Sequence, residues 1–156
     1  MTNPIAWISP SSANLGTTRR ILHWLDDIPY TLLAIPLRLG AAVVFWYSAM
    51  TKLPSWSTTV TLFAEEYQVP LLPPEVAAYM ATAIELTMPV LLVLGLLTRP
   101  AALVLLCMTA VIQVFVYPEA WPMHLQWAAM LLVLLAHGPG KLSLDWLIRR
   151  RLLGDG

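Results

Sequence analysis

The sequence predicts an all-α fold, an integral membrane four-helix bundle. Of its 156 residues, 58% are hydrophobic and only 12% are charged, whereas about a quarter of the residues of a soluble domain are charged. Two apolar runs, from Tyr30 to Met50 and from Val76 to Leu97, are long enough to cross a bilayer. Each contains a single formal charge, Arg38 in the first and Glu85 in the second. Lipid is therefore the expected solvent for most of the chain.

Four spans are expected within a membrane domain at residues 28–137, near residues 28–50, 75–97, 100–116 and 123–137. The last two are shorter than the roughly 20 residues that a perpendicular helix needs, so we expect them to extend into the interface or to lie in a thinned bilayer. The links at residues 98–100 and 117–122 are short. They allow only antiparallel neighbours.

An amphipathic outer segment is expected between spans one and two, because Trp56, Val60, Phe63 and Tyr67 follow one another at a spacing of three or four. This segment is too short to cross the bilayer. It is predicted to form an ordered cap on the outer surface.

Interfacial helices are expected at both termini. In the cytoplasmic or interfacial segment 1–27, one helix face gathers Ile21, Leu22, Trp24 and Leu25. In the basic cytoplasmic tail 138–156, Ser143 is predicted to cap a short helix. The lipid-headgroup candidates of this tail are Lys141, Arg149, Arg150 and Arg151.

The cations predict the orientation of the chain in the membrane. One side of the four-span layout holds Arg19, Arg20, Arg99, Lys141, Arg149, Arg150 and Arg151, whereas Lys52 alone lies on the other. Because Lys and Arg concentrate in cytoplasmic loops, both termini are expected to be cytoplasmic.

Arg38 and Glu85 are predicted to pair with each other. Each lies about ten residues from the end of its span, and the two spans run antiparallel, so their depths should match. A charge inside a membrane needs a partner or water around it. Two interpretations stay open: the pair locks two helices together, or Glu85 protonates or hydrogen-bonds a ligand between them.

A second polar cluster is expected near the outer boundary. Its candidate ligand-binding residues come from three spans and are Tyr47, Lys52, Gln113, His124 and Trp127. Together with Tyr117 they are suited to line a pocket for a polar headgroup such as a quinone ring. The alternative is that they are interfacial aromatic and polar residues at helix ends.

Several kinds of chemistry are not expected from these residues. Cys107 is the single cysteine, which excludes a thiol–disulfide shuttle within the chain. No spacing of His, Cys and carboxylate residues indicates a closed metal site. A covalently bound cofactor and a nucleic-acid partner are not expected either. Catalytic residues cannot be assigned from the sequence.

Three motifs carry a resemblance to a known family. They are Arg38 followed by Phe45–Leu53, Glu85 followed by Leu91–Arg99, and Gly138–Asp145. With them the chain, from about Leu37 to Asp145, resembles the DoxX family of small bacterial four-span membrane proteins. The family commonly has Gly where this chain has Ala49, a departure that concerns helix packing more than chemistry.

The resemblance implies a multi-pass protein of the bacterial cytoplasmic (inner) membrane. It allows several alternative functions. Family members are linked to quinone oxidoreductase assemblies and to complexes that resist oxidative stress. This favours a membrane subunit of a quinone-linked respiratory or redox-defence complex, with quinone as the possible cofactor and an accessory rather than an evident catalytic role. The alternatives are a non-catalytic adaptor or assembly chaperone and, third, a small permease. Besides the lipid bilayer, a protein partner or a second copy of the chain is expected.

Overall fold

The computed structural model describes residues 19–20 and 22–154, and these residues form helices and no strands. The all-α prediction is confirmed. The helices are α2 (Tyr30–Lys52), α3 (Trp56–Leu62), α4 (Pro74–Leu94), α5 (Thr98–Val111), α6 (Trp121–His137) and α7 (Leu144–Leu153). Two π-helical turns, η1 (Phe63–Tyr67) and η2 (Ile112–Val116), continue α3 and α5, and a 3-10 turn, η3 (Pro118–Ala120), leads into α6.

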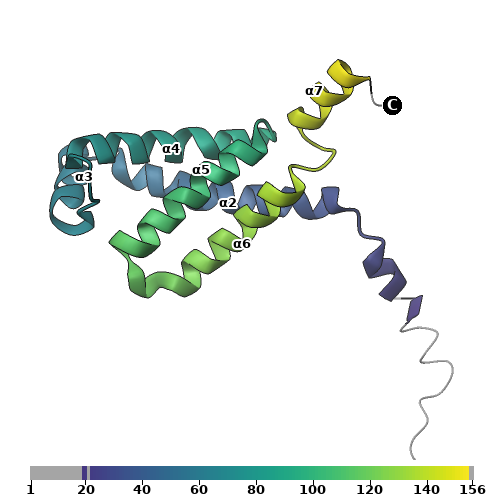
Figure 1. The fold of residues 1–156 in the computed structure, drawn as a ribbon, viewed down its shortest axis with the longest axis horizontal. Coiled ribbons are helices and arrows are strands. Elements are labelled where there is room, and N and C mark those ends of the chain that lie inside the picture. The colour runs from purple at the N-terminus through teal and green to yellow at the C-terminus, as the bar shows by residue number, and fades with distance from the viewer. Residues whose placement is uncertain (1–18, 21, 155–156) are drawn as a thin grey trace, which may run out of the picture.

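Helices α2, α4, α5 and α6 run side by side in alternating directions (Figure 1). Helix α2 packs against α4 and α6, and α5 packs against α4 and α6. Three stretches, Tyr30–Lys52, Pro74–Leu94 and Thr98–Val116, are long and apolar enough to cross a membrane. Helix α6, with 17 residues, is slightly shorter than these.

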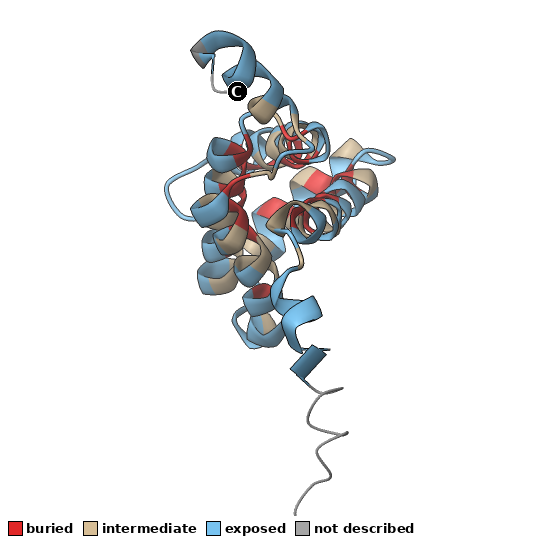
Figure 2. Ribbon diagram, turned by 90° about the vertical axis from the view of Figure 1, so that its right-hand side faces the viewer, coloured by how far each residue is buried: buried red, intermediate tan, exposed pale blue. Residues whose placement is uncertain are grey.

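The helices meet through small side chains and turn their large apolar side chains outward. The buried hydrophobic residues include the alanines Ala34, Ala41, Ala42, Ala49, Ala77, Ala78, Ala101 and Ala102. Among the exposed residues are Leu39, Val43 and Trp46, on the opposite face of α2. Figure 2 shows the buried residues turned toward the middle of the helix group. Close approach through small residues is typical of helices packed in lipid, where exposed leucine and valine carry no penalty.

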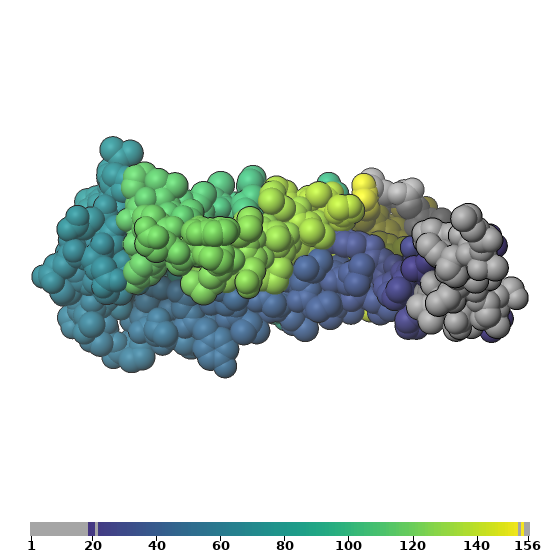
Figure 3. Space-filling view, turned by 90° about the horizontal axis from the view of Figure 1, so that it is seen from below, coloured from purple at the N-terminus to yellow at the C-terminus, as the bar shows by residue number. Residues whose placement is uncertain are grey.

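The segment between α2 and α4 forms the expected amphipathic cap. Phe63 is buried against Ala77 and Ala78 at the start of α4, and Trp56, Val60 and Tyr67 pack around this small core. The cap lies at one end of the molecule, whereas α7 lies at the other; between them α2 and α6 run along the face seen in Figure 3. The end that holds this cap is called the cap end, and the end that holds α7 is called the clasp end, after the arrangement of Arg38 described next.

At the clasp end, the side chain of Arg38 ties three parts of the chain together. Its guanidinium donates hydrogen bonds to the carbonyl oxygens of Leu92 and Val93 at the end of α4, and to those of Pro139 and Leu142 after α6. The last carbonyls of a helix have no partner within the helix, so the arginine satisfies groups that lipid cannot. We call this arrangement the arginine clasp.

Asp145 completes the clasp by capping α5. Its carboxylate accepts hydrogen bonds from the backbone N–H groups of Leu97 (2.7 Å) and Thr98 (2.9 Å), and its own N–H donates to the carbonyl of Gly95. Gly95, with φ 65°, is the C-cap of α4, whose last residue, Leu94, lies three residues before the end of the span expected from the sequence. A carboxylate at a helix N-terminus is favoured by the helix dipole.

The flanking segments lie at the clasp end and are largely exposed. Ser143 caps α7 as predicted, accepting a hydrogen bond from the N–H of Trp146. The apolar side chains of Leu147 and Ile148 are exposed, as are those of the arginines Arg149, Arg150 and Arg151. In the N-terminal segment, residues 22–26 are helical with Leu22, Trp24 and Leu25 exposed; the rest of that expectation, at residues 1–18 and 21, lies outside the described residues.

Substituting Gly95→Ala should destabilise the protein more than Gly154→Ala. Both glycines have a positive φ, 65° and 67°, but a Cβ on Gly95 would lie 2.5 Å from Cβ of Ser143 and 2.9 Å from Nη2 of Arg38, whereas a Cβ on Gly154 would meet nothing within 4 Å. The left-handed backbone penalty of about 1–2 kcal/mol is common to both, and overpacking adds about 1–3 kcal/mol at Gly95. Thermal unfolding in detergent measures the difference; equal losses would contradict the clasp.

Candidate functional site

Lys52 and Glu85 form an ion pair between α2 and α4. The ammonium nitrogen of Lys52 lies 2.8 Å from Oε2 and 2.9 Å from Oε1 of Glu85, and 2.8 Å from the hydroxyl oxygen of Ser48. Ser48 in turn donates to Oε1 of Glu85 at 2.9 Å. Both charged residues are buried, with 7% and 1% of their surface exposed. Every proton of the ammonium therefore has an acceptor inside the protein.

The prediction that Arg38 pairs with Glu85 is wrong, because the ends of the neighbouring helices α2 and α4 do not lie at the same level. Helix α2 extends beyond the end of α4 at the clasp end, so Arg38 lies level with Leu92 and Val93, to whose carbonyls it is bonded. Glu85 lies two helical turns away from Leu92, about 10 Å along α4. The residues of α2 that reach Glu85 are Ser48 and Lys52.

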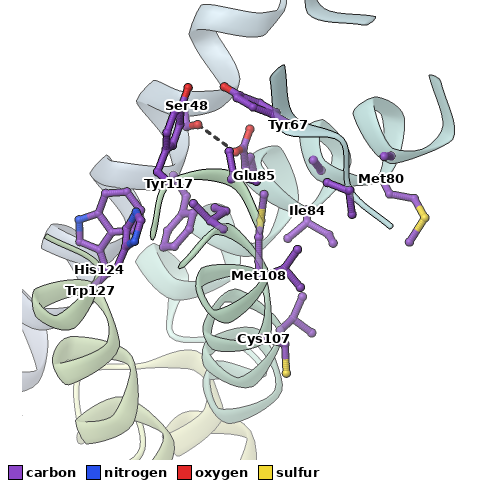
Figure 4. Close-up of a pocket in the computed structure, with 18 of the residues that line it drawn as sticks. Ser48, Tyr67, Met80, Ile84, Glu85, Cys107, Met108, Tyr117, His124 and Trp127 are labelled. Carbon is purple, nitrogen blue, oxygen red and sulfur yellow. Dashed lines mark hydrogen bonds between the residues drawn. The ribbon is translucent and has the colours of Figure 1, made fainter. Parts of the chain in front are cut away.

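The ion pair forms one wall of a cavity of about 570 Å³ toward the cap end. Its lining comes from α2, α4, α5, α6 and the cap, and its polar members include Lys52 and, labelled in Figure 4, Ser48, Tyr67, Glu85, Tyr117 and His124. Most other lining residues are apolar. A largely apolar cavity with a few polar groups is the usual form of a small-molecule site.

Part of the lining of the cavity is exposed on α4 and α5. Met80 on α4 and Leu103 and Cys107 on α5 line it and are nevertheless exposed. These residues lie on helices that are apolar enough to cross a membrane.

His124 lies in the wall of the cavity, held between a hydrogen bond and the ring of Trp127. Its Nδ1 is 2.7 Å from Oε1 of Gln113. Its ring packs 4.9 Å from that of Trp127, which in turn contacts Phe45 edge-on at 5.6 Å. Only 3% of His124 is exposed, and its Nε2 has no hydrogen-bond partner among the described residues.

Tyr117 joins the cap to the link between α5 and α6. Its hydroxyl donates a hydrogen bond of 2.6 Å to Glu66, and its ring packs edge-on against Tyr67 at 5.6 Å. The pKa of Tyr117 is raised above its ordinary value, mainly by the hydrogen bond to the Glu66 carboxylate and secondly by burial. The phenol therefore stays protonated and keeps donating to Glu66.

The structure brings together most residues of the outer cluster. Lys52, Glu85, His124 and Trp127 line the cavity. Gln113 lines a smaller groove of about 310 Å³ on the other side of His124. Tyr47, with 68% of its surface exposed, is not among the lining residues of either space. Arg38 belongs to the clasp, and the headgroup candidates Lys141 and Arg149–Arg151 are exposed beyond it.

Sequence reasoning missed Ser48 and Tyr67 as lining residues. Ser48 precedes Lys52 by one helical turn, so its place on the same face was readable from the sequence. The place of Tyr67 depends on how the cap folds back on α4, which helical periodicity does not give.

A protein-family model named DoxX matches residues 33–118, more than half of the chain. The chain belongs to the DoxX family. Within the DoxX match lie Arg38, Lys52, Glu85 and Gln113, whereas His124 and the clasp segment 138–145 lie beyond it. No curated protein and no solved structure matches the chain.

Removing either partner of the Lys52–Glu85 pair should destabilise this DoxX protein. The loss of stability in the double variant should be smaller than the sum of the losses in the two single variants. A buried charge that loses its partner costs about 3–5 kcal/mol, whereas an apolar replacement of the whole pair is often tolerated. The measurement is a double-mutant cycle of Lys52→Met and Glu85→Gln, followed by thermal unfolding in detergent.

Arg38→Met combined with Glu85→Gln is the matched control of that cycle. Since Arg38 is bonded to carbonyls at the clasp end and not to Glu85, the two losses should add. A coupling as large as that between Lys52 and Glu85 would contradict the geometry.

Proposed function

We propose that the chain crosses the bacterial inner membrane four times, with both termini in the cytoplasm. Helix α6 is the fourth span; it packs along α5 and α2, as an antiparallel neighbour in the membrane would. The cap end then faces away from the cytoplasm, and the clasp end, with α7 and its three consecutive arginines, faces the cytoplasm. This distribution of cations agrees with the general preference for Lys and Arg in cytoplasmic loops.

Cysteine labelling of intact cells tests this topology. In a Cys107→Ser background, Ser57→Cys at the cap should react with a membrane-impermeant maleimide, because Ser57 is exposed in α3. Gly154→Cys after α7 should react only once the cells are opened. The reverse pattern, or equal labelling of both sites, would contradict the proposed orientation.

We further propose that this protein is a subunit of a quinone-linked respiratory or redox-defence complex and that its cavity holds the head of the quinone. The observation that carries this proposal is a buried ion pair in the wall of a largely apolar cavity, part of whose lining is exposed on the apolar helices α4 and α5. The apolar lining suits a ring and the start of an isoprenoid tail. Glu85 and His124 supply polar atoms for the substituents of the ring.

The electrons of such a reaction would come from a partner protein. Groups of three or more His, Cys, Asp or Glu side chains that could hold a metal ion do not occur in the described part of the chain. The role proposed for this subunit is therefore to bind and orient the quinone near the electron carrier of a second protein.

Quinone extraction from the purified protein is the first test. Protein isolated in mild detergent should contain quinone in a fixed ratio to the chain, and Glu85→Gln and His124→Ala should lose it. Glu75→Gln is the matched control, because Glu75 is an exposed carboxylate in the first turn of α4. Absence of quinone from the unaltered protein, or its retention in both cavity variants, would count against the proposal.

A non-catalytic adaptor or assembly chaperone is the second candidate function. The observation in its favour is that Lys52 and Arg38 already have protein acceptors, as charges that only organise helices would. A stoichiometric protein partner without quinone, identified by mass spectrometry of the purified sample, would favour this function over the first.

A further inference from the structure

We propose that α7 is a docking surface for anionic phospholipids at the cytoplasmic face of the membrane. In this arrangement its apolar side chains lie in the membrane interface, and its three consecutive arginines contact the phosphate groups of the lipid heads. Which leaflet α7 meets follows from the proposed topology, whereas its binding to lipid does not depend on the proposed quinone site.

Helix α7 is short and lacks a partner within the described part of the chain. None of its residues belongs to either apolar core, and it packs extensively against no other helix. Figures 1 and 2 show it at the clasp end, to one side of the other helices. Its first turn is held by the bonds of Asp145 to the start of α5. Since a helix of 10 residues is marginal in water by itself, its stability depends on a surface that covers its apolar side.

The apolar side of α7 consists of Leu144, Leu147 and Ile148. Residues three and four apart share a helix face, and these three are 37%, 40% and 44% exposed. Leu152, one turn beyond Ile148, is 77% exposed. A short helix with leucines on one side and arginines around the rest is typical of segments that lie in the membrane interface.

The arginines favour a lipid surface over a protein partner. Arg149, Arg150 and Arg151 are exposed, and none of them forms an ion pair with a described residue. Successive residues point about 100° apart around a helix, so the three side chains spread over more than half of its circumference. One face of a protein would meet only part of that spread. Long arginine side chains can instead bend toward the headgroups on either side of a helix that lies among them.

Further cations lie close to α7. Lys141 precedes the helix, and Arg99 follows the two residues whose N–H groups Asp145 binds by one position or more; both cations are exposed. The carboxylate of Asp145 is engaged with the backbone of α5 and leaves this positive charge unopposed within α7. Clusters of about four to eight Lys and Arg next to a membrane helix are typical of segments that bind anionic lipids.

Spin labelling at Ile148 tests the docking. In a Cys107→Ser background, Ile148→Cys carries a nitroxide on the apolar side of α7, and the full-length protein is reconstituted in vesicles of phosphatidylcholine, with or without phosphatidylglycerol. With phosphatidylglycerol the nitroxide should become more accessible to oxygen, which dissolves in lipid, and less accessible to a water-soluble nickel chelate. Equal accessibility to the chelate in both kinds of vesicle would overturn the inference.

Ser57→Cys, labelled in the same background, is the matched control. Ser57 is exposed in α3 at the cap end, far from the cations of α7, so its accessibility should be the same in both kinds of vesicle. A change at Ser57 as large as that at Ile148 would show a general effect of the lipid on the protein and would overturn the inference.

Two triple variants test the role of charge. Arg149→Gln, Arg150→Gln and Arg151→Gln together remove the charge but keep good helix formers, so phosphatidylglycerol should no longer shift the label. Each lost arginine should weaken the attraction of α7 to the anionic surface about fivefold. The corresponding three Arg→Lys substitutions keep the charge and should keep the shift. A shift that persists with Gln, or that is lost with Lys, would overturn the inference.

A protein that covers α7 would give a different result. The label would then be shielded from both oxygen and the chelate in either kind of vesicle, with or without the arginines, and the inference would fail. Quinone does not enter these measurements. A lipid-dependent shift in a protein that contains no quinone would retain the inference and remove the proposed quinone site, whereas bound quinone without the shift would do the reverse.

Discussion

The ion pair between Lys52 and Glu85 is the constraint on which the outer half of the molecule depends. Both charges are buried among helices that turn leucine and valine outward, so removal of either one leaves the other buried without its partner and destabilises the protein. The pair and the bridging hydroxyl of Ser48 fix how far α2 is displaced along α4. That displacement brings Arg38 to the end of α4, where its hydrogen bonds join α4 to the segment after α6. The register of two helices thus links the polar groups at both ends of the protein.

The two ends use charge differently. In the clasp, Arg38 binds backbone carbonyls and Asp145 binds backbone N–H groups; both interactions satisfy helix ends that lipid cannot hydrate. This region is closely packed, since even a methyl group on Gly95 would collide with it. At the cap end, Glu85 and His124 border open space instead. The family motif that includes Arg38 therefore belongs to the architecture, whereas Glu85 and His124 line the cavity in which the proposed ligand would bind.

Helical periodicity was sufficient to predict the faces of the spans but not their partners. The face of α2 that carries Arg38 and Lys52, with Ala41 and Ala42 between them, is buried as expected. The partner of Glu85 was not predicted, because an estimate of depth counted from helix ends assumes that the two helices end at the same level. The partners of Arg38 were not predicted either, because the segment at residues 139–142 that accepts its hydrogen bonds is more than 100 residues away in sequence. Tyr47 and Ser48 show the same limit at finer scale: one residue, or about 100° on the helix, separates an exposed ring from a hydroxyl in the cavity wall.

The position of the ion pair argues for a role besides packing. A pair of apolar side chains of similar size would join α2 and α4 at least as well, since burying two charges is expensive even when they are matched. The alanines on the same helices show that close apolar contact is available to this chain. Yet the charges lie in the wall of a cavity, which is also lined by a histidine whose second nitrogen lacks a partner among the described residues. Polar groups that are costly to bury, gathered around a largely apolar cavity, are what binding of an amphipathic molecule would require.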